Sequence, residues 1–191
     1  MSIKASDVAA LRALTGAGIL DAKQALEEAK GNQEAAIDIL RKKGRSQAVK
    51  KADRLQGEGG IFIASDDSKA ALVGIRCETD FVARSDVFRA LGQDLANTLL
   101  TKGLESFTSV VSEKIPAAVL ELGENITVAE SKIVSAPVIG TYVHSNRKIG
   151  VVVGISKGTT LQATDAAMHA AAMNPLYRTS AEVPAELVTR E

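Results

Sequence analysis

The first 43 residues place apolar side chains at helical spacing, and glycines interrupt this pattern. The pattern predicts three short amphipathic helices over residues 6–43. Their apolar positions are Val8, Leu11 and Leu14, then Ala22, Ala25, Leu26 and Ala29, and finally Ala36, Ile37 and Leu40. We expect these faces to pack together as a three-helix bundle, near the lower size limit for independent folding.

Polar residues near the starts of these segments predict the helix caps. Ser6 or Asp7 is expected to cap the first helix. Asp21 and Gln24 have the spacing of a capping box for the second helix, and Asn32 precedes the third. Each helix is therefore expected to begin at a side chain that satisfies some of its free amides.

A basic segment follows the third predicted helix. Gly44 is expected to end that helix, and residues 45–56 then combine Lys and Arg with Ala and Gln. Charged segments of this kind are usually solvated, so we predict a linker helix that faces water, with nucleic-acid contact as the alternative. Glycine-rich residues 57–60 break the chain, and we place the end of the first domain at residue 56.

The chain contains an internal repeat at an offset of 80 residues. Residues 60–75 have the sequence GIFIASDDSKAALVGI, and residues 140–155 have the sequence GTYVHSNRKIGVVVGI. Each copy alternates apolar and polar positions, passes through a polar turn and ends in an apolar run, which predicts a β-hairpin. Helical periodicity follows each hairpin, over residues 86–101 and 160–173.

The segment between the two repeats is less regular. Gly103 is expected to end the first of these helices, and Pro116 is expected to open a short helix over residues 117–122. Ile126, Val128, Ile133 and Val134 follow, and their apolar pattern predicts a further strand over residues 126–134.

These elements predict an α+β fold. The N-terminal three-helix module, with its linker, occupies residues 1–56, and two hairpin-plus-helix subdomains occupy residues 57–136 and 137–191. Pro184 opens a last helix, and the sequence stops at Glu191, after too few residues for a helix that is stable alone. We therefore expect the second subdomain to be incomplete at its C-terminus.

One stretch joins the first hairpin to its helix. Residues 70–75 are apolar, residues 76–83 have the sequence RCETDFVA, and Ser85 is placed to cap the next helix. A strand-to-helix connection of this kind lies at the surface. Phe81 therefore needs an apolar pocket, and the residues alone favour a pocket in the chain's own core over one in a partner.

Charge and composition narrow the class of partner. The chain is formally neutral, yet residues 1–55 carry 11 Lys and Arg against 7 Asp and Glu, whereas residues 56–191 carry 12 against 16. Aromatic residues make up only 3%, and Trp is absent. This modest asymmetry favours a protein partner and argues against nucleic acid.

The single cysteine and the N-terminal residues indicate a compartment. Cys77 has no second cysteine to pair with, which fits a reducing environment. The first residues lack the apolar core of a signal peptide, and no apolar run approaches the ~18 residues of a membrane span. We expect a soluble cytoplasmic or organelle-matrix protein without membrane contact.

No catalytic constellation is evident. Cys77 with His144 or His169 would form a nucleophile and base, but Cys77 ends an apolar run and is expected to be a buried, inert thiol. His169 lies among Ala and Met and is expected in a helical core. No metal-ligand spacing, Walker loop or dinucleotide motif occurs. We therefore expect no enzyme activity, metal or cofactor.

Four segments resemble, in order, motifs of the elongation factor Ts family. They span residues 11–26, 77–83, 122–126 and 140–144. The resemblance covers the chain from residue 4 to its end. It implies a ubiquitin-associated-like module at the N-terminus, followed by a core built from a duplicated unit.

The resemblance also implies a function, guanine nucleotide exchange on elongation factor Tu in its GDP-bound and nucleotide-free forms. Thr79, Asp80, Phe81 and Val82 are implied to lie beside the partner's nucleotide, with Phe81 as an apolar wedge and Asp80 disturbing the Mg²⁺ site. Further partner contacts are implied for Arg12, Gly16, Ile19, Leu20, Leu122, Gly123 and His144.

Several alternatives stay open. Two functions other than nucleotide exchange are considered. The first is an adaptor that binds through residues 1–56, and the second is an RNA-associated translation protein that uses residues 41–54. Longer members of the family continue with a helical hairpin and the last part of the second subdomain, so this chain is either a fragment or a short form. A homodimer that completes the second sheet is a further alternative.

Overall fold

The computed structural model describes residues 3–177 and 179–189. Three helices precede antiparallel strands that alternate with further helices, and the predicted α+β class is confirmed. The elements in chain order are α1 (Ala5–Thr15), α2 (Ile19–Glu28), α3 (Gln33–Lys51), β1 (Glu58–Ser65), β2 (Lys69–Cys77), α4 (Asp80–Arg84), α5 (Asp86–Leu122), β3 (Thr127–Ser135), β4 (Val138–Val143), β5 (Gly150–Ile155), α6 (Thr160–Met173), a short 3₁₀ helix (Ser180–Glu182) and α7 (Ala185–Val188).

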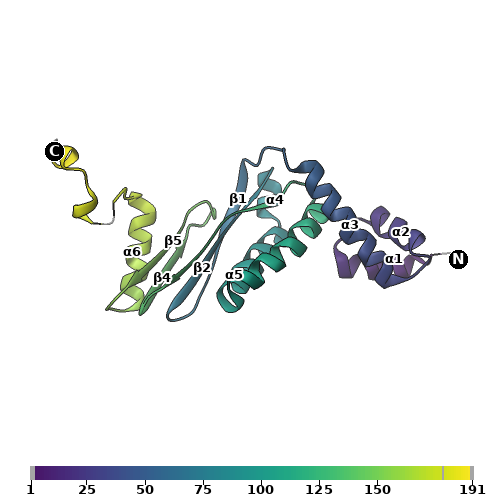
Figure 1. The fold of residues 1–191 in the computed structure, drawn as a ribbon, viewed down its shortest axis with the longest axis horizontal. Coiled ribbons are helices and arrows are strands. Elements are labelled where there is room, and N and C mark those ends of the chain that lie inside the picture. Colours follow the sequence, from purple (N-terminus) through teal and green to yellow (C-terminus); the bar gives the residue numbers. More distant parts are fainter. Residues whose placement is uncertain (1–2, 178, 190–191) are drawn as a thin grey trace.

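The elements form successive layers along the long axis of the molecule. Figure 1 shows α6, the β4–β5 hairpin, the sheet that contains β1 and β2, and α5 following one another, with α1–α3 beyond α5. The larger sheet has the order β1-β2-β3 and is antiparallel throughout. The predicted division after residue 136 falls between β3 and β4, the last and first strands of the two sheets.

The main core lies between the larger sheet and α5. Alternate residues of β1 and β2 point toward α5, as the period of a strand requires. Phe62 of β1 meets Phe88 of α5 edge to face, with ring centroids 6.2 Å apart, a favourable arrangement for two aromatic rings. The ring of Phe62 also lies directly over Gly92 of α5, where an added Cβ would be 2.3 Å from the nearest ring atoms.

The second hairpin approaches the first sheet closely at two of its glycines, Gly150 and Gly154. A Cβ on Gly150 of β5 would lie 2.5 Å from Ile61 of β1, and one on Gly154 would lie 2.6 Å from Ala136. The backbone amide of Ile61 also donates to the carbonyl of Arg147, at 2.8 Å. The second hairpin is therefore held against the first sheet by close backbone approach.

The third helix is longer than the sequence indicates. Gly44 was expected to end it, but α3 continues to Lys51. Gly44 is buried inside α3, and an added Cβ there would lie 2.7 Å from the carbonyl oxygen of Pro116. The absence of a side chain lets α3 cross α5 closely, so this glycine serves packing instead of termination.

Two of the three predicted caps are wrong. α1 begins at Ala5 and α2 at Ile19, and neither N-cap residue provides a side-chain hydrogen bond. The carboxylate of Asp21 instead pairs with Lys43 of α3, at 2.6 Å. The third cap is confirmed, because Asn32 accepts a hydrogen bond from the amide of Ala35, at 3.0 Å.

The helix α5 is a hairpin of two helical segments. Gly103 has φ 75° and ψ −177° and breaks the helix where the sequence predicted an end. The chain then returns on itself, since Lys114 pairs with Asp94 at 2.5 Å. The helix predicted over residues 117–122 is shorter than the observed one. The second segment of α5 runs from the break at Gly103 to Leu122, and Pro116 lies inside it.

Long helices of this fold are not membrane spans. In the part of the chain that the structure describes, none combines sufficient length with sufficient apolar character to cross a bilayer.

Candidate functional site

A one-turn helix, α4, occupies the connection between β2 and α5. Thr79 is its N-cap, and the threonine hydroxyl accepts a hydrogen bond from the amide of Val82, at 3.4 Å. Val82 and Ala83 pack partly buried against the main core. Ser85 then caps α5 by accepting from the amide of Phe88, at 3.3 Å, as the sequence predicted. The residues 79–82 therefore form an ordered turn at the surface.

Phe81 projects from this turn into solvent. Its relative exposure is 83%, so the expectation that it fills a pocket of its own core is wrong. Val82 and Ala83 take the inward positions of the turn, which leaves Phe81 on the outer side. An aromatic side chain held outward by an ordered backbone presents apolar surface that a partner can bury.

Asp80 lies next to this aromatic ring in sequence and stays near the surface. Its carboxylate contacts the guanidinium of Arg84, one turn further along, at 3.2 Å. An ion pair of this exposure is weak and is easily exchanged for another partner. Asp80 is thus available to approach a charged group on another protein.

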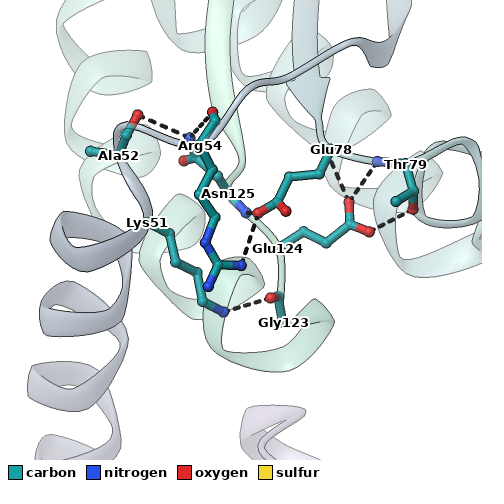
Figure 2. Close-up of polar contacts among 8 residues, drawn as sticks. All are labelled: Lys51, Ala52, Arg54, Glu78, Thr79, Gly123, Glu124 and Asn125. Atoms are coloured by element: carbon teal, nitrogen blue, oxygen red, sulfur yellow. Dashed lines mark hydrogen bonds and ion pairs between the residues drawn. The ribbon is translucent and has the colours of Figure 1, made fainter.

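The carboxylate of Glu124 binds the start of this turn from the side, as Figure 2 shows. One oxygen accepts from the backbone amides of Glu78 and Thr79, both at 3.0 Å. The other accepts from the hydroxyl of Thr79, at 2.5 Å. Hydrogen bonds to an ionised carboxylate are stronger than neutral ones, so the backbone at residues 78 and 79 is firmly held.

The carboxylate of Glu78 makes the reverse connection. It accepts from the backbone amide of Asn125 at 2.6 Å and from Arg54 at 3.3 Å (Figure 2). The buried side chain of Asn125 donates to the carbonyls of Ala52 and Arg54, at 3.2 and 3.3 Å. The end of α3, the start of α4 and the segment after α5 are thereby joined in one polar network.

Two cations of the basic segment, Lys51 and Arg54, contribute to this network, whereas Arg45 and Lys50 are exposed, as a solvated linker predicts. Lys51 is buried and donates to the carbonyl of Gly123, at 2.6 Å. Arg54 binds Glu78, as above, while Arg41 and Lys43 pair with Glu113 and Asp21, at 3.0 and 2.6 Å. The segment therefore joins the N-terminal helices to the core through specific contacts.

A cavity separates α4 from the turn between β4 and β5. Asp80, Ala83 and Arg84 line one side, and residues 145–148 line the other. His144 directly precedes these residues and is exposed, with its ring Nδ1 2.9 Å from the hydroxyl of Tyr142. The second hairpin thus brings its turn beside Asp80.

The N-terminal candidates gather at the turn between α1 and α2. Arg12, Ile19 and Leu20 are exposed there, and Gly16 ends α1 in the left-handed conformation, with φ 68°. The carboxylate of Glu121 occupies the space that a side chain on Gly16 would need. This turn therefore lies against the end of α5.

The two candidates at the end of α5 have evident structural roles. Leu122 packs partly buried against the main core. Gly123 ends the helix with φ 77°, and its carbonyl accepts from Lys51. The structure thus brings the turn at Gly16, the end of α5 and the start of α4 into one continuous series of contacts.

The prediction for Cys77 is confirmed, and the prediction for His169 is wrong. Cys77 is fully buried, and desolvation raises the pKa of its thiol to about 11, as expected of an inert thiol. His169 is exposed, so its expected place in a core is wrong: the buried stripe of α6 consists of Ala163 and Ala167. Among the described side chains, no three His, Cys, Asp or Glu residues are grouped as metal ligands.

No role was predicted for Glu78, Glu124 or Asn125, and Lys51 was predicted only as part of the solvated basic segment. Glu78, Glu124 and Asn125 lie within two of the motifs named above, but their bonds cross 45 to 47 residues of chain. The available signal was a polar pair placed between a helix-ending Gly123 and the strand residue Ile126. Such a pair in a buried segment requires hydrogen-bond partners.

Comparisons with known proteins give one consistent result. A sequence model of the family described as elongation factor TS matches residues 78–191. Proteins named elongation factor Ts from Hydrogenovibrio crunogenus, Marinobacter nauticus and Xylella fastidiosa are 42%, 40% and 41% identical to the chain. Each alignment covers all of this chain and 69%, 68% and 69% of the relative.

Proposed function

The chain belongs to the elongation factor Ts family, and from this premise we propose that it is the guanine nucleotide exchange factor of a cytoplasmic elongation factor Tu. Membership makes it a translation elongation factor. In the proposed reaction the chain binds the GDP-bound partner and promotes release of GDP, and it makes or breaks no covalent bond itself.

The exposure of Phe81 on an ordered turn carries this proposal. An apolar side chain in water gains roughly 1.5–3 kcal/mol when it is fully buried. Since Val82, Ala83 and Glu124 fix the turn, little conformational entropy remains to be lost when Phe81 enters a pocket of the partner. The ring would act as a wedge, with Asp80 beside the partner's Mg²⁺ site.

Linkage explains how binding releases nucleotide. A protein that binds the nucleotide-free partner more tightly than the GDP-bound partner must weaken GDP binding by the same factor. Each tenfold change requires about 1.4 kcal/mol of differential binding. A wedge that fits only the nucleotide-free arrangement, together with a carboxylate that disturbs the metal site, supplies such a difference.

The remaining candidates would provide affinity. Arg12, Gly16, Ile19 and Leu20 would form a second contact through the exposed turn between α1 and α2. His144 would form a third at the turn of the second hairpin. We also propose Leu122 and Gly123 as partner contacts. Within the chain they connect the N-terminal helices to the region of α4.

The structure favours exchange over the two alternatives. An RNA-binding use of residues 41–54 is weakened because Lys43 and Lys51, two of its cations, bind Asp21 and the carbonyl of Gly123 within the chain. An adaptor that functions through residues 1–56 alone would leave the exposed Phe81 without a purpose. A homodimer remains a proposal that the exchange function does not need.

The decisive experiment measures release of fluorescent GDP from elongation factor Tu. We expect the chain to accelerate release and Phe81→Ala to reduce this acceleration at least about tenfold, as expected for a binding hot spot. Equal acceleration by both proteins would contradict the wedge. No acceleration by the wild-type chain would contradict the exchange function.

Leu104→Ala is a matched control for the loss of an exposed apolar side chain. Leu104 is 61% exposed and follows the break at Gly103. It lies at the end of the α5 hairpin away from α4, about 25 Å along the first helical segment. We expect this variant to release GDP at the wild-type rate.

A further inference from the structure

We propose that Glu124 is a positioning residue for nucleotide exchange: its carboxylate holds the start of α4 so that Asp80 and Phe81 are presented in a fixed orientation. This inference rests on the proposed exchange function. Glu124 need not touch the partner, because its carboxylate acts through the backbone of residues 78 and 79.

The first argument is that α4 cannot hold its own shape. A helix of one turn has few internal hydrogen bonds and is unstable alone. Its first amides need acceptors from outside the helix. Thr79 supplies the acceptor for the amide of Val82, and Glu124 holds Thr79 in place by accepting from the amides of Glu78 and Thr79, which precede the helix.

The second argument is that Glu124 orients the cap itself. The hydroxyl of Thr79 donates to Glu124 at 2.5 Å and accepts from Val82 at 3.4 Å. Donation to the carboxylate turns the lone pairs of this hydroxyl toward the helix. The same carboxylate therefore fixes both the backbone before α4 and the side chain that caps it.

The third argument is that Glu124 is itself well anchored. Gly123 ends α5 in the left-handed conformation and has its carbonyl bound by Lys51. Asn125 is held on the other side by Glu78. The reciprocal bonds between residues 78 and 125, and between residues 124 and 79, connect α4 to the rigid end of α5 (Figure 2).

The test compares Glu124→Ala with Glu124→Gln in the GDP-release assay. We expect the alanine variant to lower the release rate at saturating factor by about tenfold, because small displacements of positioned groups have effects of this size or larger. The concentration for half-maximal acceleration should change much less. The glutamine variant keeps an oxygen acceptor for the two amides but loses the acceptor of the Thr79 hydroxyl, so it should recover part of the rate.

A structural readout accompanies the kinetics. Hydrogen exchange should accelerate at the amides of Glu78, Thr79 and Val82 in Glu124→Ala, while the core amides of β2 and α5 keep their protection. Glu130→Ala is a matched control, since Glu130 is an exposed acid whose partner is Lys132. It should match the wild type in both measurements.

A second pair of variants keeps the inference testable if Glu124→Ala does not fold. Thr79→Val removes the hydroxyl and leaves the carboxylate, whereas Thr79→Ser retains the hydroxyl. We expect the amide of Val82 to exchange hydrogen faster in the valine variant than in the serine variant, with slower GDP release in the valine variant. Equal rates for these two variants would contradict the inference.

The outcomes separate the inference from the function on which it rests. If wild type accelerates release, Phe81→Ala does not, and folded Glu124→Ala matches wild type, the positioning role alone is refuted. If Glu124→Gln releases GDP as slowly as Glu124→Ala, the bonds to the amides of Glu78 and Thr79 do not position the turn, and the positioning role is refuted. If wild type fails to accelerate release, the exchange function itself is refuted.

Discussion

The two hairpin-plus-helix units share a sequence pattern but differ in how much they bury. In the first unit, β1 and β2 gain a third strand, β3, and pack on α5 around fully buried large side chains. In the second, β4 and β5 form a two-stranded sheet whose strands are mostly half-buried. Among the residues of this second unit whose burial the structure describes, the buried ones are Ile139, Gly140, Ala163 and Ala167.

The contrast extends to the contact between strand and helix. In the first unit the strand supplies the large residue, Phe62, and the helix supplies Gly92. In the second unit Gly140 lies in the strand, and an added Cβ would be 2.1 Å from the backbone carbonyl carbon of Ala163. The first contact excludes water with an aromatic ring, and the second brings two backbones together. A repeated pattern therefore specifies the hairpin and helix but does not specify the size of the core.

This difference accounts for the place of the candidate site. A turn that presents Phe81 to a partner must be attached to a rigid part of the molecule. The turn at α4 is attached to the first unit, which has the larger core. The second unit contributes the turn at residues 145–148 across the cavity. Because its core is smaller, the second unit is expected to be less rigid. It therefore suits an additional contact surface better than it suits the insertion of a side chain into the partner.

The largest expected effect is that of Phe88→Ala. Phe88 is fully buried against Phe62, so we expect the free energy of unfolding to fall by about 3–5 kcal/mol. Met168→Ala, in the second unit, removes a side chain that is 42% exposed and should cost less than about 1 kcal/mol. Urea denaturation measures both, and equal losses would contradict the difference between the units.

An intermediate effect is expected for Gly140→Ala. The new Cβ would push α6 from β4, and such overpacking costs about 1–3 kcal/mol. We expect faster hydrogen exchange in β4, β5 and α6, with β2 and α5 unchanged. Gly57→Ala is the matched control, because nothing lies within 4 Å of its added Cβ. Faster exchange throughout the chain would show that the units do not open separately.

The smallest expected effect concerns pH and the two hairpin turns. Asp66 accepts hydrogen bonds from the amides of Ser68 and Lys69, and these bonds hold its pKa below the ordinary value of 3.8. Its equivalent in the second turn is Asn146, which binds the amide of Lys148 in the same way, at 2.9 Å, without an ionisable group.

A lowered pKa in the folded state sets the sign of the effect. The carboxylate of Asp66 stabilises the fold above the unfolded pKa of 3.8, and this contribution is lost as pH falls through the folded pKa. We therefore expect Asp66→Asn to flatten the dependence of the unfolding free energy on pH in the acid range. Asn146→Asp should steepen it. An unchanged profile in Asp66→Asn would show that other acids determine it.

Periodicity in the sequence was sufficient to predict the three N-terminal helices, the helix after each hairpin, both hairpins and the break at Gly103, but not the length of α3, the full second segment of α5 or the short helix α4. It could not predict that Gly44 lies inside a helix, because glycine ends many helices and its role here depends on Pro116, 72 residues away in the chain. The cap at Asn32 was predictable, whereas the partner of Asp21 was not, since Lys43 becomes its neighbour only after α2 and α3 pack.

The candidate site was predictable in part. The motif at residues 77–83 located the turn, and the resemblance supplied the residues implied to meet a partner. The exposure of Phe81 depends on which neighbours fill the inward positions of the turn, which a linear pattern does not define. The role of Glu124 depends on amides in another motif, so it became evident only in three dimensions.

The buried thiol at the end of β2 can also be used to measure local opening of the structure through its rate of chemical labelling. Cys77 is the only cysteine, it precedes the turn at residues 79–82, and it combines complete burial with a pKa of about 11. A thiol reagent can react with it only when the structure opens around the last residue of β2, the central strand of the sheet. The rate of labelling in the native chain therefore reports directly on the motion of the region that holds Phe81, without any introduced dye site.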